Sequence, residues 1–162
     1  MQLTKNFNTL EDIKITGCRN WSSLPTQLQN NLKKITEVAQ NIRDYYGCPI
    51  IVTSGYRIDK KNNRITNASK TSQHLFGEAL DLVFKYQKEA FHDLQNDLQT
   101  SRPLSQVILE EDGGVSWLHI ALSTNRFKQR AGLTSHRQDS CEFLTFKDGK
   151  YELVNVVKHK PS

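Results

Sequence analysis

Two segments far apart in the chain each place one ionisable side chain within a strand-like alternation of apolar residues. In residues 77–84 the alternation puts three large apolar side chains on one face and Asp81 on the other. In residues 117–122 it puts His119 opposite a second apolar face. If both apolar faces are buried in one sheet, Asp81 and His119 emerge on the same side. An acidic residue within an apolar strand is costly unless it is paired, and a cation offsets that cost.

His74 precedes the first of these strands and adds a second imidazole. Gly77 lies between His74 and the strand and lets the chain turn closely, so His74 can reach the same side of the sheet. A lone Asp is usually solvated and a lone His is usually a hydrogen-bonded structural residue. Two imidazoles and one carboxylate together are the ligands of a zinc ion whose fourth position stays open for water. We therefore expect one zinc ion per chain, bound by His74, Asp81 and His119, and a hydrolytic function.

The other segments predict an α+β fold. Apolar residues recur at spacings of three and four from Pro25 to Gly47, which indicates a long helix with Ser22 or Ser23 as its cap. A second helix is expected over residues 86–99, where apolar residues form one stripe.

Short β-rich runs predict the remaining strands. Residues 50–53 indicate a buried strand, and residues 106–110 indicate a strand that turns through residues 112–114 into the one bearing His119. Residues 60–71 are polar and indicate a loop. The expected architecture is an antiparallel sheet with a zinc site on one face and helices packed on the other.

Length and composition agree with a small protein that has no membrane span. At 162 residues the chain fits a zinc-binding unit over residues 1–122 and an extension over 123–162 within one globule. No apolar run approaches the roughly 18 residues needed to cross a bilayer, and the N-terminus lacks the apolar stretch of a secretory signal. We expect a cytoplasmic, monomeric protein. Cys18, Cys48 and Cys141 lack metal-binding spacing and are expected to be free thiols.

The extension over residues 123–162 carries most of the net charge. It has eight basic and four acidic residues, which is +4 of the chain's +5. Asp148-Gly149 between two apolar runs predicts a β-hairpin. The extension is expected either to complete the sheet as a solvated appendage or to attach to an anionic polymer, either cell wall or nucleic acid. Nucleic acid is the weaker choice because no aromatic ladder separates the basic residues. The basic residues are Arg126, Lys128, Arg130, Arg137, Lys147, Lys150, Lys158 and Lys160.

Four ordered blocks carry a family resemblance over residues 3–122. They are Ser54-Gly55-Tyr56-Arg57; Ser72-Gln73-His74 with Gly77, Ala79 and Asp81; residues 106–110, which end at Glu110; and Trp117-Leu118-His119. These blocks resemble the family of zinc D-Ala-D-Ala carboxypeptidases and phage peptidoglycan endopeptidases (endolysins), which has the Hedgehog/DD-peptidase fold.

The resemblance implies roles for individual residues. His74, Asp81 and His119 match the three zinc ligands. Arg57 matches an arginine that holds the substrate and the developing oxyanion. Ser72 lies next to the substrate in the family, and the matching blocks extend substrate binding to three neighbours: Tyr56, Gln73 and Trp117.

The catalytic base is the point at which the chain departs from many family members. Those members have a Glu three positions before the second zinc histidine, where this chain has Ser116. The subgroup that the chain most resembles has a Glu at the end of the preceding strand instead, which matches Glu110. Alternation places Glu110 on the side of Asp81 and His119. Asp112 is the second candidate, and Glu111 is the third because it points away.

The implied reaction is hydrolysis of amide bonds in peptidoglycan stem peptides. The resemblance leaves open whether a terminal D-Ala is removed or an internal L-Ala-D-Glu bond is cut. Without an export signal, such an enzyme would reach the wall after holin-type release or as a virion component, which suggests a phage or prophage origin. The alternative is a non-catalytic zinc-binding virion or tail module of the same fold, and the absence of a Glu at Ser116 supports it.

Overall fold

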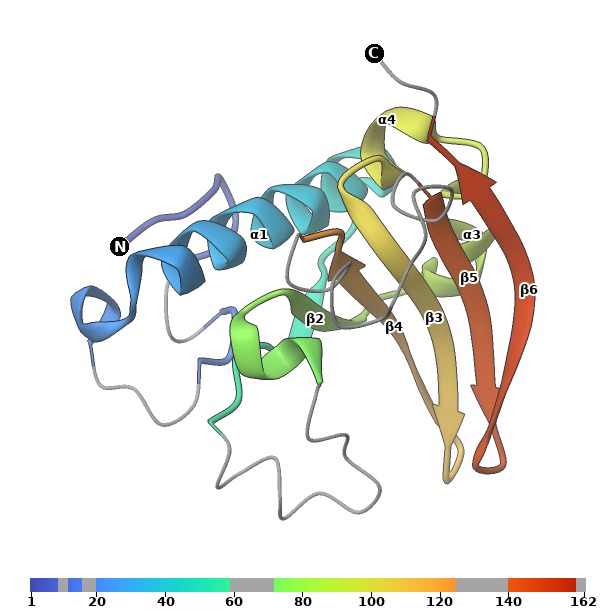
Figure 1. Cartoon of the computed structure of the whole chain (residues 1–162). Helices are drawn as coiled ribbons and strands as arrows, with labels where there is room; N and C mark the ends of the chain where they lie inside the picture. The colour runs from blue at the N-terminus through green and yellow to red at the C-terminus, as the bar shows by residue number, and fades with distance from the viewer. Residues whose placement is uncertain (9–11, 16–19, 59–71, 125–139, 160–162) are drawn as a thin grey trace.

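A six-stranded sheet in the order β1-β2-β4-β3-β5-β6 organises the computed structural model (Figure 1). The structure describes residues 1–8, 12–15, 20–58, 72–124 and 140–159. All neighbouring strands are antiparallel except β3 and β5, which run parallel. The predicted α+β fold is confirmed, with one parallel pair in a mostly antiparallel sheet. The strands are β1 (Ile51–Ser54), β2 (Ala79–Val83), β3 (Leu104–Asp112), β4 (Val115–Leu122), β5 (Ser140–Lys147) and β6 (Lys150–Lys158).

The long helix α1 (Thr26–Tyr46) covers one face of the sheet and packs on β2 and β4. Its N-cap is Pro25, and no side chain caps it. The prediction of Ser22 or Ser23 as cap was wrong, because both serines belong to a separate short 3-10 turn, η1 (Trp21–Ser23), that ends before the helix begins.

The predicted helix over residues 86–99 is two short helices, α3 (Gln87–Asp93) and α4 (Leu98–Ser101). The break comes at Asp97, whose carboxylate accepts a hydrogen bond from the Thr100 backbone at 3.2 Å and so starts a new helix. Single-stripe periodicity missed this because a capping residue can restart a helix without disturbing the apolar pattern.

The core lies between the sheet and these helices. The fully buried side chains Leu80, Leu82, Leu118 and Ile120 come from the helix-facing side of β2 and β4. The predicted strand faces are therefore confirmed. Strand β1 differs from the prediction: it lies at the edge of the sheet, so Ile51 is 62% exposed and the strand is not fully buried.

The predicted hairpin of the C-terminal extension forms strands β5 and β6 of the same sheet (Figure 1, red). Asp148 and Gly149 both have positive φ, 51° and 77°, as a tight hairpin turn requires. Phe143 of β5 is fully buried and its ring lies 5.8 Å from that of Phe91 on α3. The extension thus contributes to the core.

Two smaller predictions concern the thiols and the membrane. Cys48 and Cys141 are free thiols. Cys18 and the predicted loop over residues 60–71 lie outside the described residues. Within the part of the chain that the structure describes, no helix is long and apolar enough to span a bilayer.

Candidate metal centre

The pairing of β2 with β4 sets Asp81 directly opposite His119. The neighbouring pairs on these strands, Leu80 with Ile120 and Leu82 with Leu118, point into the core. Because side chains alternate along a strand, Asp81 and His119 project together from the other face. Burial of the apolar face therefore fixes the register that forms the site.

His74 reaches this face from a 3-10 turn, η2 (Gln73–Phe76), just before β2. The hydroxyl of Ser72 accepts a hydrogen bond from the His74 backbone N–H at 3.3 Å and caps the turn. Gly77 ends the turn with φ 65°, and a Cβ there would lie 3.0 Å from the Leu32 side chain. A larger residue at position 77 would be strained and would displace the turn that carries His74.

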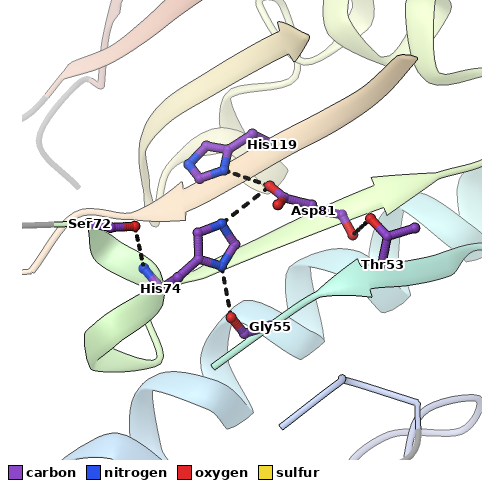
Figure 2. A network of polar contacts seen from close by, with 6 residues as sticks. All are labelled: Thr53, Gly55, Ser72, His74, Asp81 and His119. Carbon is purple, nitrogen blue, oxygen red and sulfur yellow. Dashed lines mark hydrogen bonds and ion pairs between the residues drawn. The ribbon is translucent and has the colours of Figure 1, made fainter. Parts of the chain in front are cut away.

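The side chains of His74, Asp81 and His119 point toward one another in Figure 2. Their ligand atoms all lie within 4.8 Å of one another. Oδ1 of Asp81 is 2.8 Å from Nδ1 of His119 and 3.3 Å from Nε2 of His74. Two ligand atoms at zinc–nitrogen distance around a tetrahedral ion are about 3.4 Å apart. The three residues predicted as ligands therefore come together in an arrangement that fits a metal ion.

The orientation of the His74 ring is set by the backbone of Gly55. Nδ1 of His74 lies 2.8 Å from the Gly55 carbonyl oxygen, so this nitrogen carries the hydrogen and donates it (Figure 2). Nε2 then presents its lone pair to the cluster, as a metal ligand requires. A Cβ at Gly55 would lie only 1.8 Å from the Ile13 carbonyl oxygen. Glycine is needed there for close packing, which explains part of the Ser54-to-Arg57 block.

The electrostatics of the cluster favour an ionised carboxylate. Burial alone would raise the pKa of Asp81, but its interactions with His74 and His119 outweigh burial and hold that pKa well below its usual range. Asp81 is thus a negatively charged ligand between two imidazoles, a donor set typical of zinc.

Arg57 lies within electrostatic reach of Asp81 and Glu110. Burial lowers the pKa of its guanidinium, and the two carboxylates oppose this shift. Its buried Nε has no hydrogen-bond partner among the described residues. Its backbone N–H donates to the His74 carbonyl at 3.1 Å, which ties it to the turn bearing that ligand. Arg57 therefore offers a cation and an unused donor beside the cluster.

Glu110 occupies the face predicted from strand alternation. It pairs with Trp117 across β3 and β4. This pair lies two residues along the strands from the pair of Ile108 with His119, and therefore on the same face. Burial raises the pKa of Glu110 and Asp81 adds to the rise, while His119, Arg57 and a hydrogen bond with Trp117 lower it. Its carboxylate is thus close enough to the cluster to interact with it electrostatically.

The two other acidic candidates lie elsewhere. Glu111 is on the opposite face and its carboxylate is 3.5 Å from Nζ of Lys147. Asp112 is exposed at the far end of β3. Ser116 also faces away from the cluster and hydrogen-bonds to Gln87. A glutamate at position 116 of this strand would not face the metal ligands.

The predicted substrate-binding residues are divided between site and core. Trp117 lies half-buried beside Glu110 on the face of the cluster. Tyr56 packs against the hydrophobic core. The Gln73 side chain is buried and donates to the Leu122 carbonyl at 2.8 Å and to Glu78 at 3.3 Å. This engagement favours a structural role for Gln73. Ser72 caps the turn of His74.

Sequence reasoning missed the Gly55 carbonyl as the group that orients His74, and it missed the contribution of the hairpin to the face of the site. The resemblance of a sequence block to a family indicates which side chains matter, whereas Gly55 acts through its backbone carbonyl. The parallel pairing of β3 with β5 was not predicted, so the hairpin could not be placed beside Glu110.

The fold and the cluster define a class of protein: an α+β domain with a His₂Asp cluster on one face of its sheet that fits a metal ion. The family model of Peptidase M15 matches residues 6–121, and the chain belongs to this metallopeptidase family. Comparison with curated proteins found no significant match.

Proposed function

We propose that this chain is a zinc-dependent peptidase that hydrolyses amide bonds in peptidoglycan stem peptides. The observation that carries the proposal is the convergence of three metal-binding side chains beside one carboxylate, Glu110, and one partly buried cation, Arg57. Nucleophile generation, proton transfer and oxyanion stabilisation are the three tasks of amide hydrolysis, and these residues supply one group for each.

The residues divide the reaction between them. Zinc, when bound, supplies Lewis acidity that activates water and polarises the scissile carbonyl. Glu110 takes a proton from the attacking water and delivers it to the leaving nitrogen when the C–N bond breaks. Arg57 stabilises the negative charge that develops on the carbonyl oxygen. Burial and the charge of Asp81 raise the pKa of Glu110, which favours acceptance of a proton by its carboxylate.

The substrate class and the source rest on the family resemblance of the ordered blocks. We propose either a D,D-carboxypeptidase that releases a terminal D-Ala or an L,D-endopeptidase that cuts an internal L-Ala-D-Glu bond. We further propose a phage or prophage lysis enzyme that is made in the cytoplasm and reaches the wall after holin-type release or as part of a virion.

The basic extension supports a second proposal, attachment to an anionic wall polymer. Among the described lysines, Lys147 and Lys150 already pair with Glu111 and Glu152, and both pairs are exposed. Exposed ion pairs are weak, so these lysines can still interact with an anionic polymer. Charge reversal at Lys147, Lys150, Lys158 and Lys160 should weaken binding to purified cell walls at low salt but not at high salt. Unchanged binding would reject attachment through the extension.

A dye-release assay on purified peptidoglycan tests the main proposal. Lysis, for an endopeptidase, or release of free D-Ala, for a carboxypeptidase, should occur with zinc, stop on chelation and return when zinc is restored, and mass spectrometry of the products should identify the bond. The alternative is a non-catalytic wall-binding module of the same fold. Ser116 faces away from the metal ligands, so the absence of an acidic residue at this position does not favour that alternative. Stoichiometric zinc binding with neither lysis of peptidoglycan nor release of D-Ala would favour that alternative.

A further inference from the structure

The face of the sheet that bears the metal cluster continues onto the C-terminal hairpin. Successive strand pairings place Trp117, Glu110, Phe146 and Tyr151 side by side across β4, β3, β5 and β6. Side chains directly opposite each other in neighbouring strands project from the same face. Phe146 and Tyr151 therefore extend the row that contains Glu110.

The adjacent row follows the same course. His119 pairs with Ile108 of β3, which pairs with Leu144 of β5, which pairs with Leu153 of β6. An apolar shelf thus runs from the metal cluster to the edge of the sheet. It consists of Ile108, Leu144, Phe146, Tyr151 and Leu153.

The outer part of this shelf is exposed. Tyr151 is 55% exposed and Leu153 is 59% exposed, although both are large apolar side chains. The rings of Phe146 and Tyr151 lie 4.6 Å apart and form one aromatic surface. Burial raises the pKa of Tyr151, and the charges of Glu110 and Asp81 raise it further, so its ring is within electrostatic reach of the site. Exposed apolar surface joined to a polar site is typical of a ligand-binding surface.

We propose that Phe146, Tyr151 and Leu153 form the subsite for the residue on the amine side of the scissile bond and favour an aliphatic side chain there, such as that of D-Ala, over the carboxylate side chain of D-Glu. This inference rests on the proposed peptidase function. Its direction follows from Glu110: the carboxylate that protonates the leaving nitrogen must be within hydrogen-bond reach of it. Glu110 lies between the metal cluster and the aromatic pair, so the leaving residue extends over the pair.

The residues of the proposed subsite lie outside the segment that matches the family. The family match ends at residue 121, whereas Phe146, Tyr151 and Leu153 all belong to the hairpin beyond it. Metal binding and proton transfer therefore come from the part shared with the family, and selection of the leaving residue comes from the extension.

The test uses synthetic peptides that keep the residue on the carbonyl side of the bond identified in peptidoglycan and differ only in the leaving residue, which is glycine, alanine or leucine. Zinc-loaded wild-type protein should cleave the leucine peptide with a kcat/KM at least about tenfold above that of the glycine peptide, because each buried methylene contributes a factor of about four and burial of two of the leucine carbons is enough. Tyr151→Ala and Leu153→Ala should each reduce this ratio of leucine to glycine cleavage to about threefold or less. Tyr45→Ala removes another exposed aromatic ring, 74% exposed on α1, and is the control.

Two outcomes overturn the subsite: a wild type that cleaves all three peptides equally, or variants that keep the full preference. Titration calorimetry with the same peptides distinguishes failure of the subsite proposal from failure of the proposed peptidase function. Binding that favours leucine in the wild type and loses that preference in Tyr151→Ala supports the subsite even if no peptide is cleaved. Equal affinity of the wild type for all three peptides rejects it. Circular dichroism confirms that each variant is folded, and Leu153→Ala gives an independent reading if Tyr151→Ala is not.

Discussion

Replacing Glu110 with glutamine should separate proton transfer from metal binding. Glutamine keeps the size of the side chain and can still contact the Trp117 indole through its carbonyl oxygen, but it cannot take a proton from water. Glu110 is not one of the three converging ligands, so the change leaves the metal-binding atoms of His74, Asp81 and His119 intact. Activity should fall while metal content stays constant.

The expected size of the effect follows from its position. Glu110 interacts electrostatically with His119 and Asp81, and burial raises its pKa. Loss of a positioned general base typically lowers turnover by about 10²- to 10⁴-fold. A carboxylate that merely orients a ligand histidine would instead lower metal affinity by about 10- to 100-fold. Hydrogen bonds of His74 and His119 go to Gly55 and Asp81, which argues against that second role.

Three variants measured side by side decide the assignment. Glu111→Gln is the matched control, because Glu111 is the next residue, faces away and pairs with Lys147. It should keep wild-type turnover. Asp112→Asn tests the other candidate on the same strand. Turnover on dye-labelled peptidoglycan and zinc content by atomic absorption should be measured for each. Wild-type turnover in Glu110→Gln would refute the assignment of Glu110 as the catalytic base. If Asp112→Asn were inactive in the same experiment, Asp112 would be the base instead.

Four further predictions follow from individual contacts. His119→Ala should reduce zinc content sharply in metal analysis, and undiminished zinc would exclude His119 as a ligand. Arg57→Ala should keep zinc and fold but lose most turnover, since the guanidinium acts on the transition state, and full activity would remove it from the site. Gly55→Ala should weaken zinc binding by about tenfold or more because the new Cβ meets the Ile13 carbonyl and displaces the acceptor of His74; competition with a chromogenic chelator measures this, and unchanged affinity would contradict it. Burial and the hydrogen bond to Asp93 raise the pKa of Tyr46, so its stabilisation is complete below the unfolded value of about 10 and is lost as the pH rises above it. Tyr46→Phe should therefore lower the free energy of unfolding by about 1 kcal/mol in urea at pH 7, and the difference between the two proteins should shrink at pH 11.

The metal cluster could be predicted from the sequence because one period governs both faces of a strand. The apolar residues around Asp81 and His119 had to be buried, and burying them left only one register for the two ligands. The same reasoning correctly put Glu110 on the site face and Glu111 on the other. These inferences need only alternation and a common sheet.

Features that depend on tertiary partners could not be predicted in this way. The edge position of β1 depends on which segments pack beside it. The restart of a helix at Asp97 is a local capping effect, but it leaves the apolar pattern unchanged, so periodicity alone does not record it. The parallel pairing of β3 with β5 depends on a crossover between distant segments, which local periodicity does not record. Hence the sequence predicted a hairpin in the extension but not its place beside the site.

The pairing of β5 with β3 has a consequence for how the protein can vary. Phe143 and Cys141 of β5 are fully buried, so the hairpin is held in place by the core. Alternation puts Leu144 and Phe146 on the opposite face, in line with Ile108 and Glu110. Substitutions on that outer face change what lies beside the candidate base without disturbing the buried face. A shared metal centre can therefore be combined with a different surface for the leaving residue, provided that the buried half of the hairpin is kept.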